Sequence, residues 1–281
     1  MRPTLLFPLV LAGCLSAPAA RADDPRDACA LRVSWPIDIS IAAGGAALWM
    51  TSQILQPQLA PSSCRWCDTS LHGLDRAIKV SFRWNNTKLA DTISNVTGFG
   101  LTPLAMFGLQ AGIDLANGSK PIDWAKDALI LTETVAVAMD FNQLVKFIAG
   151  RERPFIHDPG PGDQGPPAAP ADNNVSFFSG HTTSGFALAV GAGTIASLRG
   201  YRAAPAIWIS GITLASLTGY LRIAADRHYF TDVATGAIFG SAIGFLVPYL
   251  HRPCARFGAC VNGVTAAPMK SGAGLGVYGV F

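Results

Sequence analysis

Charged residues are scarce in this chain, and that scarcity limits what the protein can be. Asp, Glu, Lys and Arg make up 14% of the 281 residues, whereas about a quarter is usual for a soluble domain. The net charge is only +3, and no basic run is interleaved with aromatic residues. Nucleic-acid binding needs a basic surface, so we set that class aside. Half of the residues are apolar, which is typical of a protein that lies in or at a membrane.

The chain lacks a zinc-binding pattern, because its six cysteines do not complete one. Cys64 and Cys67 lie close together, as do Cys254 and Cys260, and Cys29 is left over. A zinc site would need the first pair to be joined by two ligands at matching spacing, and the later pair lies in a C-terminal tail. We therefore favour structural disulfides over a metal in an exported protein, with the connectivity left open.

The N-terminus has the features of an export signal. Arg2 precedes the apolar run Leu5–Leu15, and Ala20-Arg21-Ala22 forms a small-x-small cleavage site. Leu11-Ala12-Gly13-Cys14 also fits a bacterial lipobox, in which Cys14 would be lipidated, and an uncleaved signal anchor is the third reading. We expect residues 1–22 to be a signal segment and favour cleavage after Ala22.

Long apolar stretches dominate the rest of the chain and predict an all-α fold. They lack the strict alternation of strands, and each approaches the roughly 20 residues that cross a bilayer. We expect a bundle of about six core helices within residues 35–251, membrane-embedded, followed by a Gly-rich tail at 252–281. A compact globular bundle is the alternative. The stretches are Ile37–Leu55, Ile93–Ile113, Ala128–Ile148, Thr183–Leu198, Ala206–Ile223 and Val233–Leu250.

Several of these stretches contain polar side chains that are costly to expose to lipid. Such groups must face the interior of the bundle or mark functional positions. They are Asp38, Glu133, Asp140, Asn142 and Gln143. Between the third and fourth stretches lies a Pro- and Gly-rich loop, Asp158–Asn174, of a length that is often functional.

Three short segments at the edges of these stretches carry residues that suit a phosphate group. Lys146, Arg153 and Arg222 supply cations, and an Arg side chain can hold two phosphate oxygens at once. A single Lys or Arg at the edge of an apolar helix is more often an anchor at the membrane interface. Three such cations together with two histidines favour a phosphate site. Ser179-Gly180-His181 comes just before an apolar helical run, where free backbone N–H groups attract an anion. An ordinary Ser cap with a spare His is the simpler reading.

The third segment pairs a histidine with an acid. His228 and Asp232 are four positions apart, so a helix that began here would carry both on one face. Asp232 would then bind one imidazole nitrogen and leave the other free to attack. A structural hydrogen bond is the simpler interpretation of such a pair. A metal site is disfavoured, because Arg222 and Arg227 would repel the cation.

Together the three segments resemble the signature motifs of the type 2 phosphatidic acid phosphatase family, which shares its fold with vanadium haloperoxidases and bacterial class A acid phosphatases. The family pattern is Lys, six residues and Arg-Pro, then Pro-Ser-Gly-His, then Ser-Arg, five residues, His, three residues and Asp. Two positions depart from it, because Phe178 replaces the Pro and Leu221 replaces the Ser. The matching residues are Lys146, Arg153, Pro154, Ser179, Gly180, His181, Arg222, His228 and Asp232.

The resemblance implies a role for each of these residues. His228 would be the nucleophile, oriented by Asp232, and His181 the general acid for the leaving group. The phosphate ligands would be Lys146, Arg153, Ser179, Gly180 and Arg222. No metal or other cofactor is implied. His72, His157 and His251 match no motif, and we expect them to be structural or surface residues.

The function that follows is a metal-independent phosphomonoesterase that acts through a phosphohistidine on a lipid phosphate or pyrophosphate. The alternative is a broad-specificity periplasmic acid phosphatase with small phosphomonoesters as substrates. A vanadium haloperoxidase and a membrane protein that binds lipid without turnover are further alternatives, and a pure binder would not need the two histidines.

The expected location is the bacterial cell envelope, as a membrane protein with a periplasm-facing site or as an exported periplasmic protein. In a six-span bundle all three motifs fall on one side. Cleavage after Ala22 would turn that side towards the cytoplasm. Positive residues favour the cytoplasmic side, and those opposite the motifs indicate a periplasmic site instead. They are Arg199, Arg202, Arg252 and Arg256.

Overall fold

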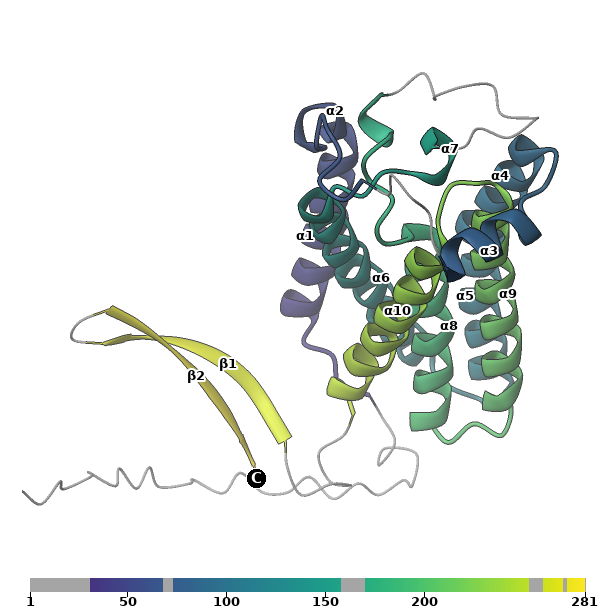
Figure 1. Ribbon diagram of the computed structural model, residues 1–281. Helices are drawn as coiled ribbons and strands as arrows, with labels where there is room; N and C mark the ends of the chain where they lie inside the picture. The colour runs from purple at the N-terminus through teal and green to yellow at the C-terminus, as the bar shows by residue number, and fades with distance from the viewer. Residues whose placement is uncertain (1–30, 68–72, 158–169, 253–259, 270–271, 281) are drawn as a thin grey trace, which may run out of the picture.

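The computed structural model describes residues 31–67, 73–157, 170–252, 260–269 and 272–280. The signal segment, the lipobox and Cys29 lie outside these residues. Figure 1 shows a bundle of long helices with short helices gathered at one end. The long elements are α1 (Trp35–Ile54), α4 (Thr87–Asn95), η2 (Val96–Leu101), α5 (Thr102–Ala116), α6 (Pro121–Ala149), α8 (Gly180–Leu198), α9 (Ala204–Ala224) and α10 (Phe230–Leu250).

Each of the six apolar stretches forms helix, so the predicted all-α bundle is confirmed for the long elements. Proline lies at the first or second position of α1, α6 and α9, where its missing N–H costs no hydrogen bond. Asn86 caps α4 by accepting from the Leu89 N–H at 2.9 Å. Gly150 ends α6 in the left-handed conformation, with φ of 56°, which leads the chain into the first motif.

The short helices were not predicted from the sequence. α2 (Gln56–Leu59), α3 (Leu74–Phe82) and α7 (Pro154–His157) lie with the 3₁₀ turn η3 (Pro170–Asp172) in the polar segments that connect the long helices. Figure 1 shows α2 and α7 together at one end of the bundle. That end also carries the C-terminus of α6 and the N-termini of α8 and α10, so the three motifs meet there.

Helix α8 forms the centre of the bundle, and most of its residues are buried. Small residues let its neighbours approach closely. On α10, Gly236, Gly240 and Gly244 recur every four residues and face the backbone of α8. A Cβ atom at Gly236 would stand 2.8 Å from the carbonyl oxygen of Ser179, which caps α8, and one at Gly244 would stand 2.8 Å from that of Ala187 in α8, both closer than real Cβ contacts. The glycine face of α10 therefore sets how near the third motif lies to the second.

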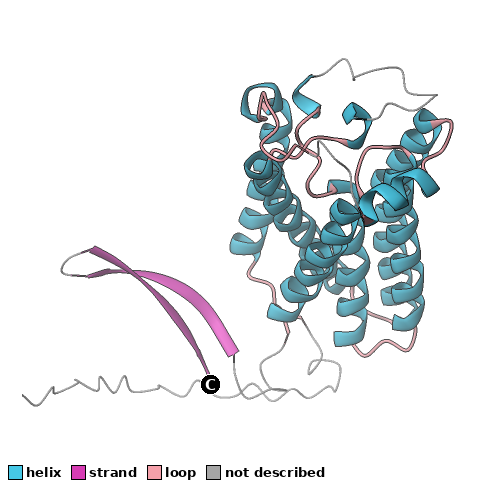
Figure 2. Cartoon of the chain, in the orientation of Figure 1, coloured by secondary structure: helices cyan, strands magenta, loops and turns pink. Residues whose placement is uncertain are grey.

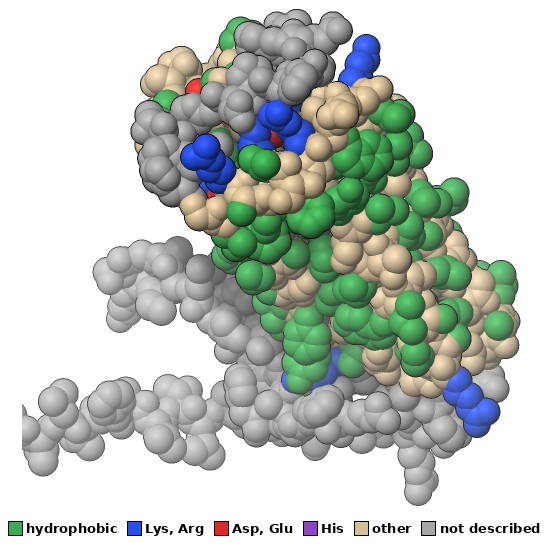
Figure 3. Space-filling view, turned by 45° about the vertical axis from the view of Figure 1, so that its right-hand side comes forward, with side chains coloured by type: hydrophobic (Ala, Val, Ile, Leu, Met, Phe, Trp, Pro, Cys, Tyr) green, Lys and Arg blue, Asp and Glu red, His purple; other side chains and the backbone are tan. Residues whose placement is uncertain are grey.

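The outer surface of the bundle is apolar, as expected of helices that face lipid. Large side chains such as Leu104, Ile209, Ile238 and Ile148 are more than half exposed. Figure 3 shows apolar side chains over the flank of the bundle, with Lys and Arg towards its two ends. By length and composition, four segments of the described chain are able to cross a membrane: Thr87–Ala116, Pro121–Ala149, Ala204–Ala224 and Phe230–Leu250.

The end of the bundle opposite the motifs holds a buried polar network. The guanidinium of Arg199 binds both carboxylate oxygens of Asp127, at 2.5 and 2.7 Å. Gln110 donates to the same carboxylate at 2.9 Å, and the Tyr201 hydroxyl donates to Asp114 at 2.6 Å. Because buried charges need partners, this network ties α5 and α6 to the turn between α8 and α9.

The C-terminal tail contains a feature that the sequence analysis missed. β1 (Cys260–Met269) and β2 (Gly272–Val280) form an antiparallel hairpin that pairs Cys260 with Val280 and Met269 with Gly272. Figure 2 distinguishes these strands from the helices. The Gly content of the tail concealed its β-branched residues, which favour strands.

Candidate active site

The structure brings six of the eight predicted site residues to one cavity of about 410 Å³ at the motif-bearing end of the bundle. Asp232 and Ser179 do not line it and are fully buried behind it. The six that line the cavity are Lys146, Arg153, Gly180, His181, Arg222 and His228. Residues separated by up to 82 positions thus share one space.

His228 lies in the turn between α9 and α10, and its side chain is almost completely buried. Its Nε2 is 3.4 Å from Nη1 of Arg153, and its Nδ1 is 3.5 Å from Oδ2 of Asp232. Burial lowers the pKa of His228 well below its ordinary value, and the nearby cations Arg153, Arg222 and Lys146 lower it further. The imidazole is therefore neutral at physiological pH, which is the form that a nucleophile requires.

Asp232 meets His228 in a different way from the one we expected. Helix α10 begins at Phe230, so His228 precedes it and the two residues do not share a helix face. The turn before α10 brings His228 and Asp232 together. Asp232 also accepts from the Tyr229 backbone N–H at 3.0 Å, so its side chain caps α10, the helix to which it belongs. Ser176 donates to the same carboxylate oxygen at 2.6 Å. The carboxylate is thus held in place beside Nδ1 of His228.

Arg151 is a part of this support that sequence reasoning missed. Its guanidinium donates to Asp232 at 2.6 Å and to Asp75 at 2.9 Å. The same group stacks between the rings of Trp66 and Tyr229, at 4.2 and 4.1 Å from their centroids. Arg151 lies inside the first motif, but its partners come from segments far away in sequence, so no local pattern signalled it.

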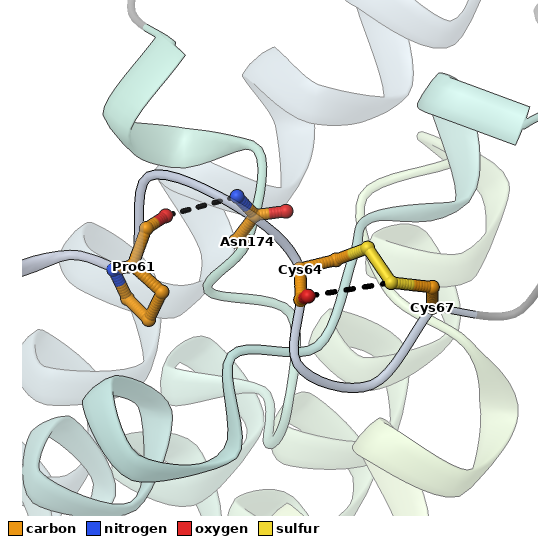
Figure 4. Close-up of a disulfide and its surroundings, with 4 residues drawn as sticks. All are labelled: Pro61, Cys64, Cys67 and Asn174. Carbon is orange, nitrogen blue, oxygen red and sulfur yellow. Dashed lines mark hydrogen bonds between the residues drawn. A yellow bond between two sulfur atoms is a disulfide. The ribbon is translucent and has the colours of Figure 1, made fainter.

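A disulfide closes the loop that carries Trp66. Cys64 and Cys67 are bonded, a pairing that the sequence left open when it favoured structural disulfides. Figure 4 shows this disulfide close to the contact between Asn174 and the Pro61 carbonyl, at 2.9 Å. Trp66 and Arg151 form an isolated parallel β-bridge. The β-bridge and the stacking of Arg151 on the Trp66 ring connect the disulfide loop to Arg151. Arg151 in turn connects this loop to Asp232. Cys254 lies outside the described residues.

The two predicted arginines of the cavity are each paired with a carboxylate. Arg153 binds Asp172 at 2.6 Å, and Arg222 binds Asp91 at 2.5 Å. Burial would raise the pKa of Asp172, but the charge of Arg153 and its neighbours keeps it below its ordinary value. Arg227 lies between them, 3.0 Å from Asp91 and 3.6 Å from Asp172. Arg227, Asp91 and Asp172 all line the cavity and were not among the predicted site residues.

The start of α8 presents backbone to the cavity next to a lysine. A Cβ atom at Gly180 would stand 3.5 Å from Nζ of Lys146 and 3.0 Å from Oδ1 of Asn142, so only glycine fits this approach without a shift. Ser179 caps the helix: its hydroxyl oxygen accepts from Thr182 Oγ1 at 2.9 Å and from the Thr182 N–H at 3.4 Å. The free N–H groups of the first turn and the lysine suit an anion.

His181 stands in the first turn of α8, on the side of the cavity formed by α4 and η2. Its Nε2 is 2.7 Å from Oδ1 of Asn95, and its ring packs on Phe99 with 4.3 Å between centroids. The π-helical turn brings Gly98 against the imidazole, where a Cβ atom would stand 3.1 Å from Cδ2. Asn95 and Phe99 line the cavity and were also missed, since nothing local marks them.

A second cavity of about 340 Å³ adjoins the first and differs from it in character. Its lining is almost entirely apolar, with Phe107, Val135 and Leu188 among its residues. Both cavities are lined by Trp49, Phe99 and Met139. A molecule with a phosphate at one end and a hydrocarbon at the other would match this pair of cavities.

Comparison with known proteins gives one family model, one curated relative and one solved structure. Residues 127–256 match the profile of the PAP2 superfamily. A 71-residue segment is 39% identical to the lipid A 1-phosphatase of Porphyromonas gingivalis, which amounts to 25% of this chain and 15% of that protein's length. The crystal structure of a transmembrane PAP2-type phosphatidylglycerolphosphate phosphatase from Bacillus subtilis aligns with 16% identity and a TM-score of 0.47, over 78% of this chain and 98% of that one.

Proposed function

Because residues 127–256 match the PAP2 superfamily, we propose that this chain is a phosphatase of that superfamily, which removes phosphate from a phosphorylated lipid through a phosphohistidine intermediate. One observation carries the proposal. A buried neutral histidine, His228, lies with one nitrogen beside Arg153 in a cation-lined cavity and the other beside the carboxylate of Asp232.

The first step is a displacement at phosphorus. Nε2 of His228 attacks, a nitrogen–phosphorus bond forms, and the bond from phosphorus to the substrate oxygen breaks. Asp232 faces Nδ1 and stabilises the positive charge that the ring acquires. His181 gives a proton to the departing oxygen. Water then attacks the phosphohistidine, His181 takes a proton from that water, and inorganic phosphate leaves with His228 regenerated.

The cations around the two histidines stabilise the charge on phosphorus. Lys146, Arg153 and Arg222, with the backbone at Gly180, surround the space in front of Nε2. Ser179 does not line the cavity, so we propose that it acts indirectly, by capping the first turn of α8 that faces the phosphate. The same cations disfavour a metal ion in this cavity, so we propose a reaction that needs no metal or other cofactor.

The substrate class follows from the apolar cavity. A hydrocarbon chain in the space lined by Phe107, Val135 and Leu188 would leave its phosphate near His228. The name of the relative that is 39% identical over 71 residues, a lipid A 1-phosphatase, is consistent with a lipid substrate. We propose a membrane location, since the flank of the bundle is apolar, and a site that faces the periplasm, since Arg199 and Arg202 lie at the other end.

The direct test compares a short-chain phosphatidic acid with p-nitrophenyl phosphate, using full-length protein in detergent. We expect phosphate release from both and a higher kcat/KM for the lipid, because a buried methylene contributes about 0.8 kcal/mol to binding. For phosphatidic acids with acyl chains of four, six and eight carbons, each kept below its own critical micelle concentration, kcat/KM should rise with chain length. A value independent of chain length would identify a broad-specificity acid phosphatase, and no phosphate release at all would refute the proposal.

Metal removal and vanadate test the chemistry separately. Phosphate release should persist in EDTA when it is assayed well below the unfolding temperature of the protein. The reason is that the proposed nucleophile and general acid are both side chains. Vanadate should inhibit competitively, since it adopts the five-coordinate geometry of phosphorus in the transition state and would bind His228 and the cations. Activity that disappears with EDTA and returns with Mg²⁺ would show that the mechanism is misassigned.

A further inference from the structure

A second group of chemically active side chains lies at the opposite end of the bundle from the phosphatase cavity. Asp38 is in the first turn of α1, Glu133 is in the middle of α6, and His251 follows the last residue of α10. Nε2 of His251 is 3.4 Å from Oε2 of Glu133 and 3.6 Å from Oδ2 of Asp38. All three ligand atoms lie within 4.8 Å of one another.

The orientation of His251 directs its free nitrogen at the carboxylates. Nδ1 lies 2.9 Å from the carbonyl oxygen of Val247, to which it can only donate. Such a hydrogen bond to a carbonyl fixes the tautomer of metal-binding histidines, since a neutral ring that donates from Nδ1 carries its lone pair on Nε2. In the neutral ring that lone pair faces two carboxylates. A cation placed between Nε2 and the two carboxylates would remove the repulsion among them, because all three groups could then act as its ligands.

Glu133 supplies an independent sign that a partner belongs here. The residue is 6% exposed, and its Oε2 has no hydrogen-bond donor within the described part of the chain. A buried carboxylate oxygen without a donor is costly. Protonated His251 would balance one of the two carboxylates, whereas a divalent cation would balance both. Asp38 is held in position by the Ser34 N–H, which donates to its Oδ2 at 2.7 Å.

We propose that Asp38, Glu133 and His251 bind a divalent cation of the zinc type, with a structural role. Tetrahedral ligands about 2.0–2.2 Å from zinc are separated by roughly 3.3–3.6 Å, which agrees with the two distances from Nε2. One imidazole and two carboxylates suit zinc better than Mg²⁺ or Ca²⁺, which take oxygen ligands. The bound ion would join α1, α6 and α10 at a point remote from the phosphatase chemistry.

The test measures zinc binding to full-length protein that has first been stripped with a chelator. After equilibration with Zn²⁺ and removal of the excess, elemental analysis should give a higher zinc content for the parent than for His251→Ala or Glu133→Gln, by about one ion per chain. Asp140→Asn is the matched control, because Asp140 is a carboxylate on the same helix that lies outside the cluster. It should retain the parent's zinc.

Thermal unfolding gives a second readout, and the response of the parent to zinc can be measured without any variant. At free Zn²⁺ about a hundred times its dissociation constant, the midpoint of the parent and of Asp140→Asn should rise by roughly 5–10 °C. Mg²⁺ should have no such effect, and His251→Ala should not respond to zinc. Equal zinc content in the parent, His251→Ala and Glu133→Gln would overturn the proposal, as would a parent that neither binds zinc nor responds to it. Phosphate release at low temperature should be the same with and without zinc, so this result is separate from the proposed function.

Discussion

Replacement of His228 by Ala should reduce phosphate release by more than about 10⁴-fold on every substrate, because the proposed nucleophile is removed. Two structural features support a loss of this size. Nε2 of His228 is directed at the cavity beside Arg153, and burial with neighbouring cations lowers the pKa of His228 so that the attacking nitrogen is unprotonated. Initial rates on a lipid phosphate and on p-nitrophenyl phosphate measure the effect.

The intermediate itself can be detected in the same experiment. Rapid quenching into base after mixing with ³²P-labelled substrate should trap labelled parent protein, because phosphohistidine survives base and decomposes in acid. His228→Ala should remain unlabelled while unfolding at the temperature of the parent. Lys88→Ala, which removes an exposed cation of α4 outside the cavity, is the control and should keep both turnover and label. Turnover in His228→Ala near that of the parent would rule out the phosphohistidine mechanism.

The helices could be predicted from the sequence because their apolar character is local. The stretch Ile37–Leu55 corresponds to α1 at Trp35–Ile54, and the small shift reflects Pro36, which starts the helix. The stretch Ala128–Ile148 underestimates α6, whose first turns contain Asp123 and Lys126 and so look polar. Helix starts that rely on caps are harder to find, and α8 begins three residues before the expected Thr183.

The candidate site was predictable only where the chemistry lies in short motifs. Those motifs supplied His181, His228 and the cations, and six of the eight proposed residues line one cavity. The missed residues act through partners distant in sequence: Asp91 pairs with Arg222 across 131 positions, and Arg151 reaches Asp232 across 81. A carboxylate or amide in a polar segment carries no signal of which arginine or histidine it will meet after folding.

The buried polar residues of the apolar stretches show the same limit. Their presence predicted that they face the interior. Asp38, Glu133, Asn142 and Gln143 are buried, whereas Asp140 is only half-buried. Nothing local distinguishes Gln143 at the phosphatase cavity from Glu133, which belongs to the cluster at the other end. Only the packing of α1, α6 and α10 sorts them into two sites.

The effects of His181→Ala and His228→Ala on the rate should differ when the leaving group of the substrate is varied. The proposed task of His181 is to protonate the departing oxygen, and an alkyl phosphate leaves as a basic alkoxide that needs this proton. A nitrophenolate is a far better leaving group and needs it much less. His181→Ala should therefore slow a lipid phosphate about 10²- to 10⁴-fold, and p-nitrophenyl phosphate much less. His228→Ala should slow both.

The ring of His181 is held by Asn95 and Phe99. Burial lowers the pKa of His181 well below its ordinary value, and the nearby cations Arg222 and Lys146 lower it further, so the acid form depends on the bound substrate. A phosphate dianion that binds near the ring would favour the protonated imidazole, because it adds negative charge beside it. The acid form would thus be promoted by the substrate that needs it.

A series of aryl and alkyl phosphates with leaving groups of increasing pKa gives the sharpest form of the test. In the parent, log kcat should depend weakly on leaving-group pKa, because His181 donates a proton as the bond breaks. In His181→Ala the dependence should become steep, while Lys88→Ala should follow the parent. If His181→Ala lowers kcat by the same factor across the whole series, the slope is unchanged, and His181 then binds phosphate or holds the first turn of α8 and is not the acid.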